Sequence, residues 1–385
     1  MSTKVKNTAN VVIIGAGVVG NSIAFNLARE GVKDVVVLEK DYLTSGASGR
    51  CGAGIRQQWG TEMNCRLAKA SMNTFENINE VLNVKRDIEL KQGGYLLLAY
   101  SEKEINQFRK NIKLQNNLGI PSREISLEEV KDLVPYINLA GIKGAAYCPT
   151  DGHANPFQTT VAFAEAAEKL GVEINTYTKA LDIKKQDDKI KGVLTNKGFI
   201  KTDTVVNAAG GFAKEIGEMV GIDIPVKPER HEIMVTEKIN NILKPMVMSF
   251  SYDIYCQQTP GGSFIMGYGP EDPPESHNRK SSWDFMEKMA YKTTQLLPKL
   301  KNLRVIRQWA GSYTMTPDNQ PIIDSSDKVS GFYMAVGFSG HGFMMSPMTG
   351  QIIAEKIVGK ETSMDLDLTL KRFQKGNLIL EPSVV

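Results

Sequence analysis

The sequence predicts an α/β fold in which a domain built on a parallel sheet is interrupted by a second, largely antiparallel domain. A buried apolar strand, residues 11–14, breaks into a helix through Gly15-Ala16-Gly17-Val18-Val19-Gly20. Residues 225–324 have a different texture, with short β-type segments and many prolines, which favours an antiparallel sheet. Another apolar strand, residues 331–337, then leads into a second glycine-rich turn and helix. The first domain therefore resumes after the second.

The bulk composition limits the class of protein. The 385 residues exceed one ordinary domain, and the charges nearly balance, with 46 Lys and Arg against 43 Asp and Glu. We therefore expect no nucleic-acid or anionic-membrane partner. No early apolar stretch is long enough for a signal peptide or a membrane span, so we predict a cytoplasmic protein. The four cysteines form no CxxC pair, which argues against a disulfide framework and a metal site.

The remaining elements follow from periodicity and capping signals. Residues 35–38 are continuously apolar, as a parallel strand buried on both faces should be. Ser126 begins a capping box with Glu129, which predicts the start of a helix. We predict helices over 21–29, 62–82, 102–117, 126–133, 156–170 and 347–358, strands over 93–99, 172–176, 203–211, 232–236 and 263–267, and a hairpin over 180–199.

The first glycine motif predicts a dinucleotide site. One glycine makes the tight turn, one lets backbone amides approach a pyrophosphate, and one lets the helix pack closely on the strand. Glu39 lies nineteen residues beyond Gly20, where a carboxylate can accept hydrogen bonds from both ribose hydroxyls. Glycines at such a turn also occur for packing alone, but the apolar strand and the placed carboxylate favour the dinucleotide.

The second glycine-rich turn, residues 337–343, favours a flavin over a nicotinamide. Two helix N-termini directed at one ligand suit a flavin dinucleotide, because the second can stabilise negative charge on the reduced ring. In an NAD(P)-dependent dehydrogenase this second turn has no obvious task. A turn enriched in glycine by chance is the alternative.

Four segments carry a family resemblance: residues 15–20 with Glu39-Lys40, 54–58, 313–318 and 337–343. Together they resemble the D-amino-acid oxidase family of FAD enzymes over residues 11–359. The likeness is to its secondary-amine branch, which includes monomeric sarcosine oxidase, the β subunit of heterotetrameric sarcosine oxidase, glycine oxidase and the β subunit of dye-linked L-proline dehydrogenase.

The resemblance implies a glutathione-reductase-like architecture. A Rossmann-type FAD-binding domain would comprise residues 1–90, 145–220 and 325–375, interleaved with a substrate or cap domain of 91–144 and 221–324 on a mixed or antiparallel sheet. The residues expected to contact FAD are Gly15, Ala16, Gly17, Val18, Val19, Gly20, Glu39, Lys40, Ser45, Ser48, Gly49, Ala180, Ala208, Ala209, Gly210, Gly311, Gly337, Gly340, His341, Gly342, Phe343 and Met344.

The implied chemistry is oxidation of a carbon–nitrogen bond by hydride transfer to flavin N5, in a small amino acid such as proline, sarcosine or glycine. Arg56 corresponds to an arginine that contacts the substrate carboxylate in sarcosine oxidase, although it could instead hold its own loop. Tyr313 corresponds to an active-site tyrosine, with a core role as the alternative. His341 is expected beside the flavin, and His231 borders it with the weakest assignment.

Three departures from monomeric sarcosine oxidase change the expected chemistry. Gly311 replaces the cysteine that tethers flavin, so FAD should be non-covalent. Ile265 and Met344 occupy positions where the resemblance leads one to expect lysines. A fixed cation near the flavin stabilises the superoxide that forms with oxygen, so without these lysines the reduced flavin should react slowly with oxygen. We therefore expect a dehydrogenase that passes electrons to a carrier or an α-type partner subunit.

The alternatives are a peroxide-producing sarcosine or glycine oxidase and a non-catalytic subunit stabilised by its flavin. The resemblance also allows FMN at a subunit interface, although no sequence pattern fixes such a site. The particular amino acid, its stereoisomer, the acceptor and the oligomeric state stay open.

Overall fold

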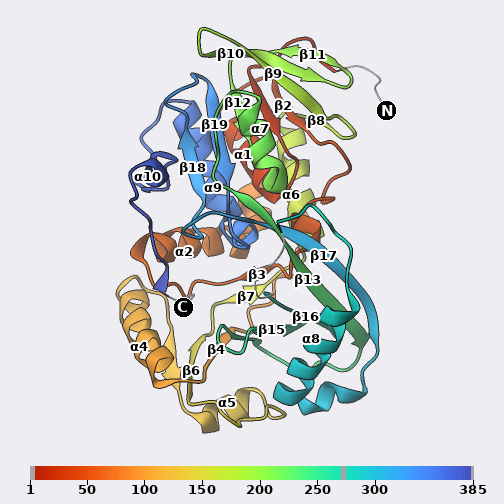
Figure 1. Cartoon of the computed structure of the whole chain (residues 1–385), viewed down its shortest axis with the longest axis vertical. Coiled ribbons are helices and arrows are strands. Elements are labelled where there is room, and N and C mark those ends of the chain that lie inside the picture. The colour runs from red at the N-terminus through yellow and green to blue at the C-terminus, as the bar shows by residue number, and fades with distance from the viewer. Residues whose placement is uncertain (1–4, 270–274, 383–385) are drawn as a thin grey trace.

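The computed structural model describes residues 5–269 and 275–382 and has two lobes stacked along its long axis (Figure 1). The upper lobe is built on a six-stranded sheet whose strands, in spatial order, are β18 (Ile322–Ser325), β19 (Phe332–Val336), β12 (Val205–Asn207), β1 (Val11–Ile14), β2 (Val35–Leu38) and β8 (Glu173–Asn175). All adjacent pairs are parallel except β18 with β19. The predicted parallel sheet is thus confirmed.

The two faces of this sheet bury alternate residues against different layers. Val11 and Ile13 share a core with helices α1 (Val18–Arg29), α6 (Pro156–Lys169) and α9 (Gly342–Ile357). Val12 and Ile14 instead pack with a three-stranded antiparallel sheet of β9 (Ala180–Gln186), β10 (Lys189–Thr195) and β11 (Gly198–Lys201). Because side chains alternate along a strand, both faces of β1 are apolar and covered.

The lower lobe is a mixed eight-stranded sheet, as the sequence predicts. Its strands, in spatial order, are β17 (Val305–Met315), β13 (Lys227–Lys238), β16 (Ser263–Tyr268), β15 (Ile254–Gln258), β14 (Met246–Ser249), β4 (Tyr95–Ala99), β6 (Gly144–Cys148) and β5 (Arg123–Ile125). Only the β14–β4 pair is parallel among these pairs. The helices of this lobe are α4 (Glu102–Asn117), α5 (Leu127–Leu133) and α8 (Trp283–Leu296). Strand β6 puts residues 145–148 in this sheet, although the domain limits proposed from the sequence place them in the other domain.

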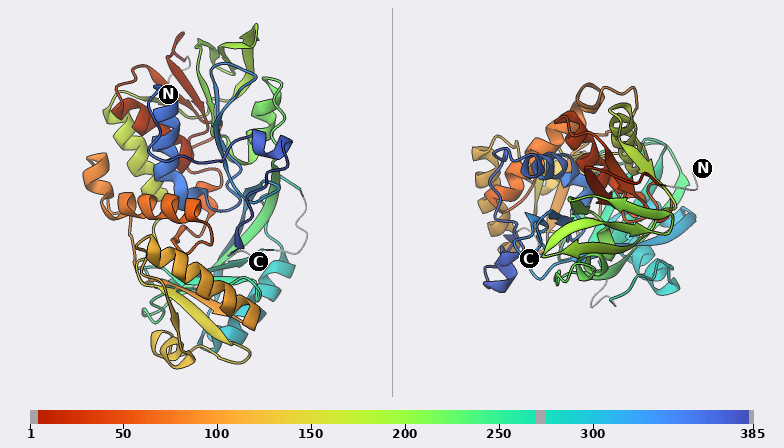
Figure 2. Two further views of the ribbon diagram at one scale, coloured as in Figure 1. Left: turned by 90° about the vertical axis from the view of Figure 1, so that its left-hand side faces the viewer. Right: turned by 90° about the horizontal axis from the view of Figure 1, so that it is seen from above.

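The junction between the lobes is formed by short elements and two long strands. Helix α2 (Glu62–Glu76) lies across it, and β13 and β17 extend up to it from the lower sheet (Figures 1 and 2). The chain has further short elements, not all of them at the junction. They are α3 (Ile78–Leu82), α7 (Ala213–Glu218), α10 (Lys371–Gln374), the strand pair β3 (Gly54–Ile55) and β7 (Gly152–His153), and the 3₁₀ turns η1 (Ser48–Arg50), η2 (Gly210–Phe212) and η3 (Pro298–Asn302).

Three predicted helices differ in their bounds, and the one expected over 21–29 begins three residues earlier as α1 (Val18–Arg29). The helix expected over 62–82 is divided at Asn77 into α2 and α3, because Asn77 leaves the helical conformation. Helix α9 begins at Gly342 and continues through Pro347, which cannot donate to the carbonyl of Phe343. The hydroxyl of Ser346 donates to that carbonyl instead, at 2.9 Å. The capping box at Ser126 is confirmed, whereas α8 is a helix that the sequence patterns did not predict.

Candidate active site

A cavity of about 480 Å³ is lined by residues of both lobes, within the size range of small-molecule sites. The predicted cofactor residues that line it are Gly15, Gly17, Val18, Val19, Glu39, Lys40, Ser45, Ser48, Ala180, Ala208, Ala209, Gly210, Gly311, Gly337, Gly340, Gly342 and Phe343. Tyr313 and His231 also line it. The predicted residues outside the lining are Ala16, Gly20, Gly49, Arg56, His341 and Met344.

The first glycine turn leaves no room for side chains. A Cβ at Gly15, whose φ is +112°, would lie 2.3 Å from the carbonyl oxygen of Ala208. A Cβ at Gly20 would lie 1.9 Å from the carbonyl oxygen of Gly15, so this glycine lets α1 pack against the turn. A Cβ at Gly17 would meet the hydroxyl of Ser48 at 3.0 Å. The turn therefore brings bare backbone to the cavity wall.

Glu39 is held at the end of β2 by the backbone around it. Its Oε2 accepts from the amide of Ala16 at 3.1 Å, and its Oε1 accepts from the amide of Asp41 at 3.0 Å. The hydroxyl of Ser48 lies at the start of α1, where it accepts from the amide of Val18 at 3.0 Å. The glycine turn, the first turn of α1 and the carboxylate thus form one cradle, which fits the pyrophosphate and ribose of a dinucleotide.

Two arginines in the cavity wall are absent from the sequence predictions. Arg50 donates from Nε to the carbonyl of Ser45 at 3.1 Å and from Nη1 to the carbonyl of Ala310 at 3.3 Å. Arg279 donates to the same Ser45 carbonyl at 3.2 Å. Burial, followed by the charge of Arg279, lowers the pKa of Arg50. Arg50 lies in the glycine-rich loop and could have been singled out there; the position of Arg279 depends on distant packing.

Tyr313 and His231 stack on neighbouring strands at the other side of the cavity. Their ring centroids lie 3.8 Å apart with an interplanar angle of 11°. His231 pairs with Gly311 across β13 and β17. Its Nε2 is buried without a hydrogen bond among the described residues and lies 3.9 Å from Oε2 of Glu229. Burial, with a smaller contribution from Cys51, raises the pKa of Tyr313 to about 12, so the phenol is neutral.

The second glycine turn wraps around the end of β17. Gly340 has a φ of +90°, and a Cβ there would lie 2.4 Å from the ring of Tyr313. His341 is the N-cap residue of α9 and packs edge-on against Trp59, with 4.5 Å between ring centroids. Burial, followed by the charge of Arg56, lowers the pKa of His341 to about 3. The imidazole is therefore neutral, and at neutral pH it cannot act as a cationic donor.

Arg56 is buried next to, but outside, the cavity lining. Its Nη1 donates to the carbonyl of Gln58 at 2.7 Å, and the guanidinium lies 4.0 Å from the ring centre of Trp59. Among the described residues no carboxylate forms an ion pair with it. The side-chain amide of Gln58 donates to the carbonyl of Tyr95 at 3.1 Å, which joins the loop of Arg56 to strand β4. The substrate role of Arg56 stays a prediction.

The three positions at which the resemblance to monomeric sarcosine oxidase leads one to expect lysine or cysteine lie in different surroundings. Ile265 pairs with Val235 and Gln257 inside the lower sheet and is outside the cavity lining. Met344 is buried in the first turn of α9. A Cβ at Gly311 would lie 3.1 Å from Cβ of Arg50.

Membrane-spanning helices and metal clusters are both absent from the described part of the chain. No helix there is long and apolar enough to cross a membrane. Within the same residues, no three His, Cys, Asp or Glu side chains are grouped so as to hold a metal ion, and all four cysteines are free.

The parallel sheet, the glycine turn with a carboxylate beside it and the second helix directed at the same cavity are typical of a dinucleotide-dependent oxidoreductase. Residues 10–356 match the family model DAO, described as FAD dependent oxidoreductase, and the chain belongs to this family. The predicted family and its FAD cofactor are thereby confirmed.

The relatives are similar over nearly the whole chain. L-proline dehydrogenase from P. horikoshii is 39% identical with a TM-score of 0.93, covering 97% of this chain and 100% of that one. Sarcosine oxidase subunit beta of Rhodobacter capsulatus is 26% identical over 99% of this chain and 92% of its own length. Mitochondrial dimethylglycine dehydrogenase of Rattus norvegicus is 28% identical over 96% of this chain, which spans only 45% of that relative.

Proposed function

We propose that this chain is a dehydrogenase that oxidises the carbon–nitrogen bond of a small secondary amino acid, of the proline or sarcosine type. The observation that carries the proposal is the 39% identity with an L-proline dehydrogenase over 97% of this chain and 100% of that chain. FAD, when bound, supplies the electron acceptor for this oxidation. Primary amino acids such as glycine are a less favoured substrate of the same site.

Arg56 is proposed to anchor the carboxylate of the amino acid. A guanidinium carries five N–H donors, and the described residues engage one of them by a hydrogen bond to Gln58. A buried cation that no carboxylate contacts directly is unfavourable, so a substrate carboxylate would complete its hydrogen bonding. Because Arg56 lies outside the cavity lining in this structure, this role requires that Tyr95 or the loop at 54–58 give access to it.

Tyr313 and His231 are proposed to flank the reacting amine. Oxidation requires the neutral amine, whose lone pair is free. His231 presents a ring nitrogen without a hydrogen bond among the described residues, which can accept the amine proton, and the neutral phenol of Tyr313 can donate. His341 is proposed to shape the pocket as a neutral ring rather than to move protons, because burial and Arg56 lower its pKa to about 3.

We propose that the electrons pass from the reduced flavin to a carrier or a partner subunit rather than to oxygen. Neither Ile265 nor Met344 supplies a cation, and similarity to a sarcosine oxidase subunit beta supports an association with further subunits. An oxygen-using oxidase is the second candidate, and it is favoured by one observation. Arg50 places a half-buried guanidinium beside Gly311, where it could stabilise superoxide. A non-catalytic subunit and an FMN site are supported by no contact among the described residues.

The experiment is a panel of L-proline, D-proline, hydroxyproline, sarcosine, dimethylglycine and glycine, offered to the purified protein with an artificial dye, with and without air. We expect rapid dye reduction by a secondary amino acid and little hydrogen peroxide. Abundant peroxide that falls in Arg50→Met would instead establish the oxidase. No turnover of any amine by a flavin-loaded protein would support the non-catalytic subunit.

A further inference from the structure

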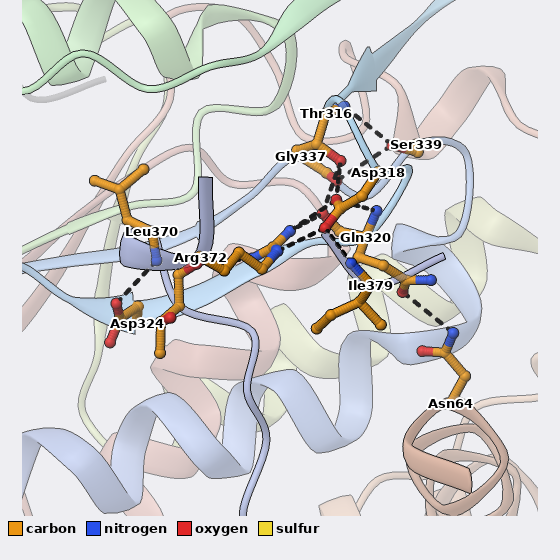
Figure 3. A network of polar contacts seen from close by, with 11 residues as sticks. Asn64, Thr316, Asp318, Gln320, Asp324, Gly337, Ser339, Leu370, Arg372 and Ile379 are labelled. Atoms are coloured by element: carbon orange, nitrogen blue, oxygen red, sulfur yellow. Dashed lines mark hydrogen bonds and ion pairs between the residues drawn. The ribbon is translucent and has the colours of Figure 1, made fainter. Parts of the chain in front are cut away.

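The segment 369–381, which includes α10, contacts the turn after the strand of Tyr313 and the start of α2 near Arg56, without lining the cavity itself. Its first anchor is Arg372, which binds Asp318 through two hydrogen bonds, Nε to Oδ2 at 2.8 Å and Nη2 to Oδ1 at 3.0 Å (Figure 3). The side chains are 1% and 0% exposed. Nη2 also donates to the carbonyl of Gln320 at 2.7 Å. A fully buried, bidentate pair holds this connection in a single geometry.

The Asp318 turn is joined in turn to the strand end that carries Tyr313. The hydroxyl of Thr316 donates to Oδ1 of Asp318 at 3.3 Å, and the amide of Thr316 donates to the hydroxyl of Ser339 at 3.3 Å (Figure 3). The amide of Ser339 donates to the carbonyl of Thr314 at 3.0 Å. The Arg372–Asp318 ion pair is thus connected, through Thr316 and Ser339, to the glycine turn whose Gly340 packs against the Tyr313 ring.

The second anchor is Glu381, which is buried against the start of α2. It accepts from the amide of Gly60 at 2.6 Å, from the hydroxyl of Thr61 at 2.9 Å and from the side-chain amide of Asn64 at 2.7 Å. Asn64 also donates to Oε1 of Gln320 at 3.1 Å, which links the two anchors (Figure 3). Because Gly60 lies four residues after Arg56, Glu381 fixes the end of the loop on which Arg56 is carried.

Glu381 also acts on Arg56 through its charge. Burial lowers the pKa of Arg56, and the groups that oppose this shift include Tyr95, Glu381 and Asp151. Burial raises the pKa of Tyr95 far above its ordinary value, so this phenol carries no charge at neutral pH. Burial also raises the pKa of Asp151 to about 6, which still leaves this carboxyl mostly ionised at pH 7. Glu381 and Asp151 are therefore the two carboxylates that stabilise the guanidinium.

We propose that the segment 369–381 sets the geometry of the substrate site, with Glu381 positioning the Arg56 loop and Arg372 positioning the Tyr313 strand. Neither residue touches the cavity, so both act through other residues. The inference rests on the proposed function, because it assigns the consequence to carboxylate binding by Arg56. A role in holding the fold alone would affect all ligands of the site equally.

The test compares amines that differ only in the carboxylate: L-proline with pyrrolidine, and sarcosine with dimethylamine. Binding to the FAD-loaded protein is followed by the change in flavin absorption. Glu381→Gln should weaken binding of the amino acids about 10-fold, as expected for a perturbed charge-assisted contact, and leave pyrrolidine and dimethylamine unchanged. FAD content should match that of Glu361→Gln, a control at an exposed glutamate. Equal losses for all four amines, or no loss, would overturn the positioning role.

Two further variants separate this inference from the proposed function. If Arg56→Met leaves the preference for carboxylate-bearing amines intact, the anchor assigned to Arg56 is wrong. If Arg56→Met abolishes that preference and Glu381→Gln does not reduce it, only the positioning role is wrong. Should Glu381→Gln fail to fold, Glu381→Asp keeps the charge on a shorter side chain. We expect an intermediate loss of preference from it, and a wild-type preference would contradict the proposal.

Discussion

Replacement of Gly20 by alanine tests the close packing of α1 on the cofactor turn. The new Cβ would lie 1.9 Å from the carbonyl oxygen of Gly15, whereas ordinary contacts are 3.4 Å or longer. The Cβ is fixed to the helix backbone and the carbonyl belongs to the backbone of the turn, so in a densely packed interior the helix and the turn must separate by about 1.5 Å. Overpacking of this kind costs about 3 kcal/mol at the upper end of its usual range, whereas the helix propensity of alanine returns about 1 kcal/mol. We expect a net loss of about 2 kcal/mol.

The assay is thermal unfolding of the FAD-free protein together with FAD titration by fluorescence. Gly20→Ala should unfold at a lower temperature and bind FAD more weakly, because the turn that approaches the pyrophosphate has moved. Gly261→Ala is the matched control, since Gly261 lies outside the cavity lining and a Cβ there would make only an ordinary contact, 3.8 Å from Oγ1 of Thr259. Wild-type stability and FAD affinity in Gly20→Ala would refute the packing argument.

Three further predictions concern the substrate anchor, a buried histidine and the buried ion pair. Arg56→Met should raise the apparent Kd of amino-acid substrates by about 10- to 100-fold and leave FAD bound; unchanged Kd would remove Arg56 from the site. In the folded protein the imidazole of His341 has a pKa of about 3 and binds a proton only below that pH. In the unfolded chain the same imidazole is protonated below about pH 6.5. The wild type therefore loses stability from about pH 6.5 down to about pH 3, and the melting temperature of His341→Asn should fall less steeply over this range; equal slopes would contradict the burial of a neutral imidazole. Asp318→Asn leaves the guanidinium of Arg372 buried without its counter-charge and should cost about 3–5 kcal/mol, whereas Asp318→Leu with Arg372→Met should recover much of it; a single variant as stable as the double one would count against this reasoning.

Local rules were sufficient to predict the strand–turn–helix geometry of residues 11–29 and the carboxylate placed beside it. The requirement for glycine at positions 15 and 20 follows from backbone geometry, and the structure shows the contacts that exclude a side chain there. The carboxylate of Glu39 likewise follows from strand length and the spacing to the motif. These features lie within one strand–turn–helix–strand unit, so short-range sequence patterns encode them.

The substrate side depends on contacts between distant segments, which patterns do not encode. Arg56 falls outside the cavity lining because its guanidinium packs on Trp59 and near Phe250, a residue almost two hundred positions away. Arg279 meets the carbonyl of Ser45 from a different lobe. Helix α8 was not predicted because it lies within residues 225–324, whose short β-type segments and many prolines indicate a sheet.

The most direct measurement is the visible absorption spectrum of the purified protein, recorded without oxygen before and after addition of L-proline or sarcosine. We predict the bands of oxidised flavin in the free protein and their bleaching by at least one of the two amines. A protein that stays colourless after reconstitution with FAD, or a yellow protein whose bands neither amine changes, would contradict the account.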